Sequence, residues 1–173
     1  MVSPHPPWTD GRVKSFIIYA DSGGGSAYAV ETMQDAIKEV RQMGKNVVGL
    51  VRKGGMACSA MYMILSACSA IYVENEMSIV GSNGTMIQFE GRKANTESPD
   101  GEKHVRVYAT KSTKKNVDFE EALNNDNYQM LIDNMLDPLN ERALSRVLEN
   151  RPQLQGTDWD SGIDVFAKDV IGT

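Results

Sequence analysis

The chain has 173 residues, the size of one ordinary domain, and 41% of them are hydrophobic, which is enough to bury a sizeable core. Acidic residues outnumber basic ones by 23 to 18, so the net charge is -5 and no basic face for nucleic-acid phosphates is indicated. No run of about 18 apolar residues occurs, which excludes a transmembrane helix within these residues. We therefore expect a single domain over residues 1–173, with no nucleic-acid partner and no membrane segment.

The first part of the chain alternates apolar runs with an amphipathic pattern. Val13–Ala20 and Asn46–Val51 are nearly continuous apolar runs, which are typical of strands buried on both faces of a parallel sheet. Between them, apolar residues recur every three or four positions, which predicts a helix that Ser26 caps and Gly44 ends.

A second pair of elements follows in the same order. A long apolar helix is predicted from about Cys58 to Ser69, and a third strand at Ala70 to Val73. This alternation of strands, glycine turns and helices predicts a right-handed parallel α/β unit with both faces of its sheet covered.

Three shorter strands are predicted next, near Ser78–Gly81, Thr85–Gly91 and Val105–Ala109. Between the last two, Lys93–Lys103 has the composition of a polar, solvated loop.

Helical spacing returns from Asp118 to Asn150, where we expect Pro138 to kink or divide the helix. A short final helix is predicted near Gly162 to Ala167. The sequence therefore predicts an α/β fold with a helical C-terminal segment.

Cysteines and histidines are few. Cys58 and Cys68 are ten residues apart in one predicted helix, about 15 Å at the usual rise, which is too far for a disulfide. We expect both thiols in the core. The two cysteines and two histidines have unrelated spacings, so no metal site is expected.

Glycine-rich turns follow the first two predicted strands. Asp21–Ser26 contains three successive glycines, and Lys53–Gly55 contains two. Because the carboxyl ends of parallel strands lie at one edge of a sheet, where sites form, we expect both turns on one rim. The first turn lacks the residues of a P-loop or a dinucleotide fingerprint, so no nucleotide and no other cofactor is expected.

Ser59 is a candidate nucleophile. It is expected in the first turn of an apolar helix, beside unpaired backbone N–H groups that stabilise negative charge. The N–H of Ala60, with those of Gly24 and Gly25, could form the donor set that an oxyanion needs in acyl transfer. The alternative is that Ser59 only caps the helix.

A nucleophilic serine needs a base, and the candidates are few. His5 lies in an irregular leader and His104 follows a polar loop, which leaves little for a Ser-His-Asp triad. Lys111, Lys114 and Lys115 are a richer supply, since a desolvated lysine can act as a general base. The alternative is that this run is a solvated, positively charged turn.

Three segments taken together resemble the signal peptide peptidase A family of serine-lysine proteases, including its phage head-maturation relatives. They are the strand and turn from Asp10 to Gly25, the segment Gly55–Tyr62 and the stretch Ser78–Gly84. The resemblance covers most of the chain. It implies the fold of the Clp protease and crotonase group, with repeated β-α units and a mainly parallel sheet. It also implies a homo-oligomer that acts on polypeptides with a serine nucleophile and a lysine base.

The resemblance also indicates which lysine acts. In the family the base lies just before the long helical segment, and Lys115 is 56 residues after Ser59 while Lys114 is 55 after it. Lys115 is preferred because Lys115-Asn116 is similar to the step found in relatives. Lys114 and Lys111 stay open as alternatives.

The chain departs from the family in several places. Gly23 replaces the usual proline, and Ala60-Met61 stands where bacterial peptidases tend to have Gly-Gly, which bears on the first specificity pocket. The family's domain also has a strand before the one at Val13, and relatives continue beyond Thr173. One interpretation is that the chain is a fragment that lacks the first strand and the C-terminal end.

The function that follows is a serine endopeptidase whose Ser-Lys dyad hydrolyses extended polypeptide segments. Its role would be phage capsid or scaffold maturation, which we prefer, or signal-peptide degradation. The expected location is the bacterial cytoplasm or a phage prohead, and a membrane only if an anchor was removed. Two alternatives stay open: a non-catalytic oligomeric scaffold or binding module of the same fold, and a crotonase-like acyl-CoA enzyme that stabilises a thioester enolate.

Overall fold

The computed structural model describes residues 6–93 and 96–172. Their packing divides the chain into two compact units. The sheet unit holds the residues up to Thr85 and from Asn140 onward, and the helical unit holds Met86–Leu139. The expectation of a single domain over residues 1–173 stays a prediction.

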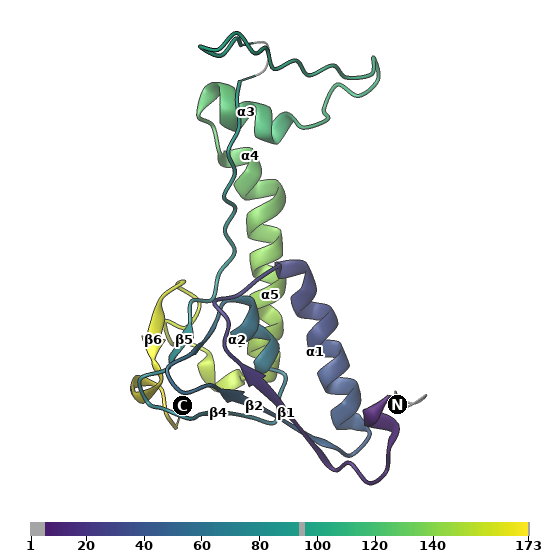
Figure 1. The fold of residues 1–173 in the computed structure, drawn as a ribbon, viewed down its shortest axis with the longest axis vertical. Helices are drawn as coiled ribbons and strands as arrows, with labels where there is room; N and C mark the ends of the chain where they lie inside the picture. Colours follow the sequence, from purple (N-terminus) through teal and green to yellow (C-terminus); the bar gives the residue numbers. More distant parts are fainter. Residues whose placement is uncertain (1–5, 94–95, 173) are drawn as a thin grey trace. The chain divides into compact units, whose positions relative to one another are not determined.

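The sheet unit contains a parallel sheet in the order β1-β2-β4 (Figure 1). Its strands are β1 (Ser15–Ala20), β2 (Asn46–Val51) and β4 (Ala70–Val73). The limits predicted for β2 and β4 are confirmed, and β1 begins two residues later than predicted. The mixed α/β class with a parallel sheet is therefore confirmed.

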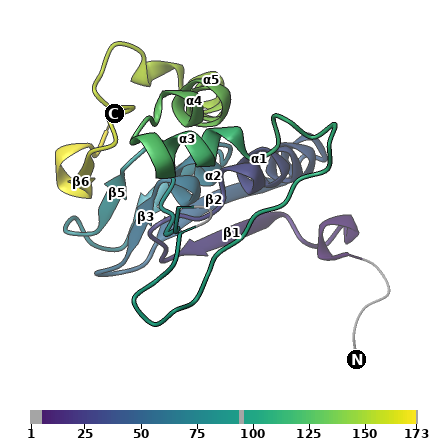
Figure 2. The same ribbon diagram turned by 90° about the horizontal axis from the view of Figure 1, so that it is seen from above.

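Helices cover one face of this sheet. They are α1 (Ala27–Gln42), α2 (Ala60–Leu65) and the part of α5 from Asn140 onward (Figures 1 and 2). The limits of α1 are as predicted, with Ser26 at the N-cap position and Gly44 just past its end at a φ of 77°. The core between helices and sheet is built from buried apolar side chains, including Val30, Ile37, Val47, Val51, Met63, Leu65 and Val147.

The opposite face of the sheet is open among the residues described. Ile17 on β1 is 63% exposed and Tyr72 on β4 is 58% exposed. The expectation that both faces are covered is therefore wrong, and so is burial of Val13–Ala20 on both faces. The reason is that α1, α2 and α5 of this unit all pack on the same side of the sheet.

The sheet unit also contains a second, mixed sheet, whose strands are hydrogen-bonded in the order β3-β5-β6. Its strands are β3 (Met56–Cys58), β5 (Ile79–Gly81) and β6 (Asp164–Phe166). β3 and β5 are parallel, whereas β5 and β6 are antiparallel. The strand predicted near Ser78–Gly81 is confirmed as β5.

Two helix predictions need correction in this region, one in its limits and one in its type of element. The helix predicted from Cys58 to Ser69 is shorter, because Cys58 ends β3 and α2 begins only at Ala60. The residues from Gly162 to Ala167 form β6 instead of a helix, because they pair with β5. Three 3-10 turns complete the regular structure described for the sheet unit: Pro7–Thr9, Pro152–Leu154 and Ala167–Asp169.

The helical unit breaks the predicted helix at an unexpected place. α3 (Val117–Asn125) ends at Asp126, which has a φ of 53°. α4 (Gln129–Leu131) and a π-helical segment, η2 (Ile132–Leu136), then lead into α5 (Asp137–Asn150). The chain is thus divided at Asp126. Pro138 lies inside the continuous helical run of α4, η2 and α5, two residues after the π-helical segment ends, so the helix is irregular next to Pro138 but is not divided there.

The strands predicted at Thr85–Gly91 and Val105–Ala109 are wrong, because neither segment pairs with another strand in the described residues. In Thr85–Gly91 the alternation of apolar and polar residues reflects one side turned towards helices, whereas in Val105–Ala109 the apolar side chains are exposed, with Val107 86% exposed. Ile87 and Phe89 are half-buried on that side of the first segment. The polar loop at 93–103 is confirmed as a largely exposed segment, with residues 94 and 95 outside the described part.

A polar cluster joins α1 to α5 inside the sheet unit. Gln34 is fully buried, and its amide donates to the Met63 carbonyl at 2.8 Å. Its Oε1 accepts from Nε of Arg146 at 2.7 Å. Arg146 also pairs with Glu31 and Asp35, so one largely buried guanidinium holds two helices together.

Arg146→Ala should destabilise the fold by about 1–3 kcal/mol, because it leaves Gln34 Oε1 buried without a donor. Arg142→Ala is the matched control: its side chain is 63% exposed and pairs with Glu31, which keeps Arg146, so a loss of under about 1 kcal/mol is expected. Urea unfolding of both variants measures the difference. Equal losses of unfolding free energy in the two variants would show that the unpaired Gln34 Oε1 adds no destabilisation of its own.

Candidate active site

Ser59 lies in a tight turn between a strand and a helix. β3 ends at Cys58 and α2 begins at Ala60, so the reversal falls on Ser59 alone, with a φ of 51° and a ψ of −127°. A residue with a β-carbon rarely adopts this backbone, and such a conformation costs about 1–3 kcal/mol. The expectation that Ser59 lies inside the first helical turn is therefore corrected.

Backbone hydrogen bonds hold Ser59 in this conformation. Its N–H donates to the Gly81 carbonyl at 2.8 Å, and its own carbonyl accepts from Met63 N–H at 3.0 Å. The hydroxyl makes no hydrogen bond to the first turn of α2. Ser59 thus occupies the N-cap position without capping, and helix capping does not explain a serine here.

The first glycine turn lies directly against Ser59. A β-carbon built on Gly24 would be 2.8 Å from Ser59 Cβ and 3.2 Å from its Oγ, and Gly24 has a φ of 133°. Only glycine fits such a close approach with this backbone. The expectation that the turns after the first two strands meet on one rim is confirmed.

The two turns are tied together by Asp21. Its carboxylate accepts from Nη1 of Arg52 at 2.8 Å and from the N–H of Met56 at 3.2 Å. The backbone of the next residue, Ser22, makes two further bonds to β3. Its N–H donates to the Met56 carbonyl at 2.7 Å, and its carbonyl accepts from the Cys58 N–H at 3.0 Å. The turn therefore continues as a partner of β3, which fixes its position beside Ser59.

The predicted oxyanion donors differ in what they contact. Gly24 N–H is directed at Ser22 Oγ, 3.2 Å away. Ala60 is the first residue of α2, where a backbone N–H has no partner within the helix. Gly25 is exposed and has open space around it. The N–H of Gly24 is thus directed at Ser22 Oγ, and the role of Ala60 and Gly25 as oxyanion donors stays a prediction.

The three candidate lysines all belong to the helical unit. Lys111, Lys114 and Lys115 are exposed in the turn before α3, and Lys115 N–H donates to the Ser112 carbonyl at 3.1 Å. His104 is exposed in the polar loop of the same unit. His5 falls outside the described residues. The pairing of Ser59 with one of these lysines stays a prediction.

Side chains next to the lysine turn fix its shape. Asn116, with a φ of 66°, donates to Tyr108 Oη at 3.3 Å, and Tyr108 donates to Glu120 at 2.9 Å. Arg106 pairs with the same carboxylate at 2.9 Å. The hydroxyl of Tyr108 and then the guanidinium of Arg106 lower the pKa of Glu120.

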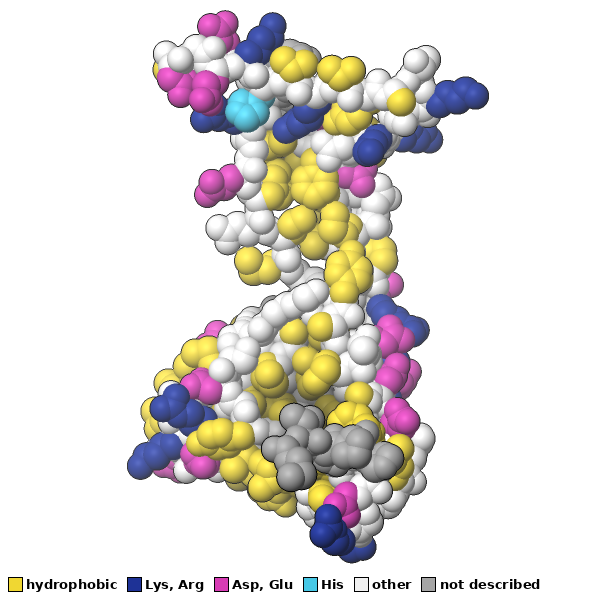
Figure 3. Space-filling model, turned by 45° about the vertical axis from the view of Figure 1, so that its right-hand side comes forward, with side chains coloured by type: hydrophobic (Ala, Val, Ile, Leu, Met, Phe, Trp, Pro, Cys, Tyr) yellow, Lys and Arg dark blue, Asp and Glu magenta, His cyan; other side chains and the backbone are white. Residues whose placement is uncertain are grey.

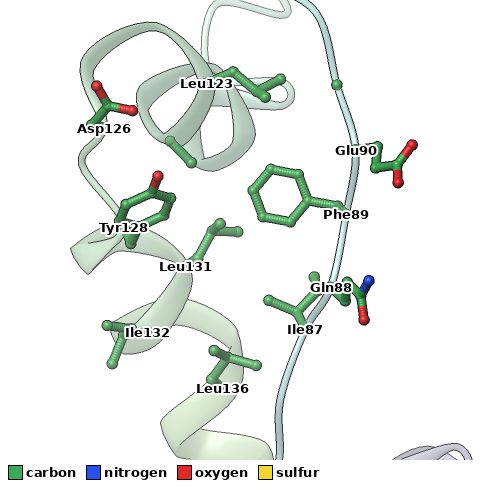
Figure 4. A pocket seen from close by; sticks show the side chains of 12 residues that line it. Ile87, Gln88, Phe89, Glu90, Leu123, Asp126, Tyr128, Leu131, Ile132 and Leu136 are labelled. Atoms are coloured by element: carbon green, nitrogen blue, oxygen red, sulfur yellow. The ribbon is translucent and has the colours of Figure 1, made fainter.

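The helical unit also has an apolar groove that sequence reasoning missed. It encloses about 700 Å³ between the extended residues 87–91 and the helices, and hydrophobic side chains gather along this unit in the upper half of Figure 3. Figure 4 shows Phe89 and Ile87 facing the helices across it. Phe89 packs edge-on against Phe119, with ring centres 5.3 Å apart. The alternation at 86–90 signalled a buried side but not a groove.

No group of three or more His, Cys, Asp or Glu side chains suited to a metal ion occurs in residues 6–93 and 96–172. In the same residues, no helix is both long and apolar enough to cross a bilayer.

No protein-family model matches the chain. Over 80 residues, or 46% of its length, the chain is 35% identical to a protein named Protease 4 from Haemophilus influenzae. The match covers 12% of that protein, so the chain corresponds to a small part of it.

Gly24→Ala should destabilise the fold by about 1–3 kcal/mol, since the new β-carbon would meet Ser59 and the φ would be strained. Gly25→Ala should be close to neutral, because its neighbourhood is open and its backbone N–H is kept. Chemical denaturation of the two variants tests this, and a neutral Gly24→Ala would contradict the described approach to Ser59.

Both cysteines should resist alkylation in the native chain at pH 8. Burial raises the pKa of Cys68 to about 11 and also raises that of Cys58, so little of the reactive thiolate forms. Iodoacetamide followed by mass spectrometry should find both thiols unmodified until the chain is unfolded in denaturant. Native modification of Cys58 would instead point to a reactive thiol beside Ser59.

Proposed function

We propose that the chain is the peptidase part of a serine protease and that Ser59 is its nucleophile. The observation that carries this is the strained Ser59 between β3 and α2, with an uncommitted hydroxyl and Gly24 packed against it. Strained strand-to-helix turns present nucleophilic serines in hydrolases because they expose the hydroxyl beside backbone N–H groups. The similarity to Protease 4 over 80 residues supports a protease.

In the proposed reaction, Ser59 Oγ attacks the carbonyl carbon of a peptide bond while a lysine in its uncharged form takes the hydroxyl proton. The resulting oxyanion is held by the N–H groups of Ala60 and Gly25. The lysine then gives its proton to the leaving amine, and the same lysine activates the water that hydrolyses the acyl-serine. Lys115 is the preferred base, with Lys114 and Lys111 as the alternatives.

Gly24 would join the donor set only after a small change. Its N–H points at Ser22 Oγ, which in turn donates to the Gly24 carbonyl at 3.1 Å. An oxyanion is a stronger acceptor than a hydroxyl, so we propose that substrate draws this N–H away from Ser22 in the transition state.

The proposal extends to the family and its setting. We propose a member of the signal peptide peptidase A family with the Clp protease and crotonase type of fold. It would assemble as a homo-oligomer, act on extended polypeptides without a cofactor, and serve phage capsid maturation in preference to signal-peptide degradation. Support comes from the three sequence segments named above and from the parallel sheet with its two glycine turns.

A fluorophosphonate probe, applied between pH 6 and 9 and followed by mass spectrometry, tests the nucleophile. We expect an adduct on Ser59 whose rate of formation rises with pH, because the uncharged lysine becomes more abundant. Ser59→Ala should lose the adduct and peptide hydrolysis completely while it keeps the fold. Full hydrolysis by Ser59→Ala would eliminate the serine.

Single alanine variants at the three lysines identify the base. Lys115→Ala should slow labelling at least about 100-fold, the usual contribution of a general base, whereas Lys111→Ala should label at the normal rate. The two variants share a turn and a charge, so each controls for the other. A folded, oligomeric preparation with no adduct at any pH would favour the non-catalytic scaffold.

A further inference from the structure

The turn after β5 supports the strained serine. Gly81 ends this strand with a φ of 102° and Ser82 follows with a φ of 50°. The Gly81 carbonyl is the acceptor for the Ser59 N–H. The conformation of Ser59 therefore depends on where this turn, Gly81–Gly84, holds that carbonyl.

Residues 159–163, which are distant in the sequence, are hydrogen-bonded to the turn Gly81–Gly84. Ser82 N–H donates to the Ile163 carbonyl at 2.7 Å, and Ser82 Oγ donates to the Gly162 carbonyl at 3.3 Å. A β-carbon on Gly81 would lie 3.0 Å from the Ile163 carbonyl oxygen, so the two backbone segments are closely packed.

Asn83 makes a third hydrogen bond between the turn and residues 159–163, and its burial leaves one polar atom without a partner among the described residues. Its side chain is buried, with the residue only 1% exposed. Its Nδ2 donates to the Trp159 carbonyl at 3.1 Å, whereas its Oδ1 has no partner among the described residues. An apolar side chain of similar size would avoid the unpaired acceptor. The amide is therefore explained by its bond to Trp159 and not by packing.

We propose that Asn83 is a positioning residue for Ser59, an inference that rests on the proposed function. Its amide holds the turn Gly81–Gly84 against Trp159, so that the Gly81 carbonyl stays where it receives the Ser59 N–H. That hydrogen bond keeps Ser59 in its strained backbone, with the hydroxyl directed away from the cap position. Without Asn83 the turn can shift, and Ser59 can relax towards an ordinary backbone.

The test compares Asn83→Leu with Asn150→Leu in the whole chain. Leucine removes the donor and the unpaired acceptor of Asn83 and keeps the branching of its heavy atoms, although leucine is the bulkier side chain. Asn150 is a matched control, since it also donates one part-buried hydrogen bond, at 3.2 Å to Ser66 Oγ, and has no contact with the turn. Three quantities are measured for each: the urea midpoint, amide hydrogen exchange at Ser59 by NMR, and the rate of fluorophosphonate labelling.

For Asn83→Leu we expect exchange at the Ser59 amide to be faster and labelling to be slower, each by about tenfold, as fits the loss of one buried hydrogen bond. Its urea midpoint should match that of Asn150→Leu, which should keep normal exchange at Ser59 and normal labelling. A purely structural role would instead lower the midpoint and accelerate exchange throughout the sheet unit. That pattern overturns the proposal.

The outcomes separate this inference from the proposed function. If the natural chain is labelled and Asn83→Leu matches it in labelling and in exchange at Ser59, Asn83 has no positioning role and the nucleophile stands. If the natural chain is never labelled, the proposed function fails, and exchange at Ser59 alone decides whether Asn83 supports the turn. Should Asn83→Leu not fold, Asn83→Ala, which removes both amide groups without adding volume or charge, gives the same comparison, with Asn150→Ala as its control.

Discussion

The pairing of β3 on both of its edges governs the geometry around Ser59. Its three residues, Met56–Cys58, lie between Ser22 on one side and β5 on the other. These bonds keep the backbone extended as far as Cys58, while the apolar residues from Ala60 onward pack as a helix against α1. One residue must take up the whole change of direction. The strain at Ser59, its uncapped hydroxyl and the approach of Gly24 therefore have a common cause.

Local sequence signals predicted the elements that depend on few partners. The apolar runs of β2 and β4 and the spacing and ends of α1 identified those elements almost to the residue. β3 was missed because Met56-Ala57-Cys58 is apolar and adjoins an apolar helix, and periodicity cannot separate the two. β6 was missed because only β5, more than 80 residues earlier, makes it a strand.

The sequence indicated which residues belong to the candidate site but not their backbone conformations or contacts. Ser59 and Gly24 could be placed together because their segments follow two neighbouring parallel strands, Gly24 after the first predicted strand and Ser59 after the second, which is a rule about topology. The backbone of Ser59 could not be predicted, since it depends on the partners of β3. Asn83 gave no signal at all: it is one asparagine in a glycine-containing turn, and its partner Trp159 lies 76 residues further along the chain.

The positive φ at Ser59 means that the fold itself gains nothing from a serine there. Glycine reaches this backbone without a clash of its β-carbon, so the position least suited to serine is the one on which the proposed chemistry depends. A copy of the chain with glycine at 59 would keep the pairing of β3, the packing of α2 and the outer surface. Under the proposed function and assembly, such a copy would be inert but intact, a single base change or two away, and it would join active copies and dilute their activity without disturbing their architecture.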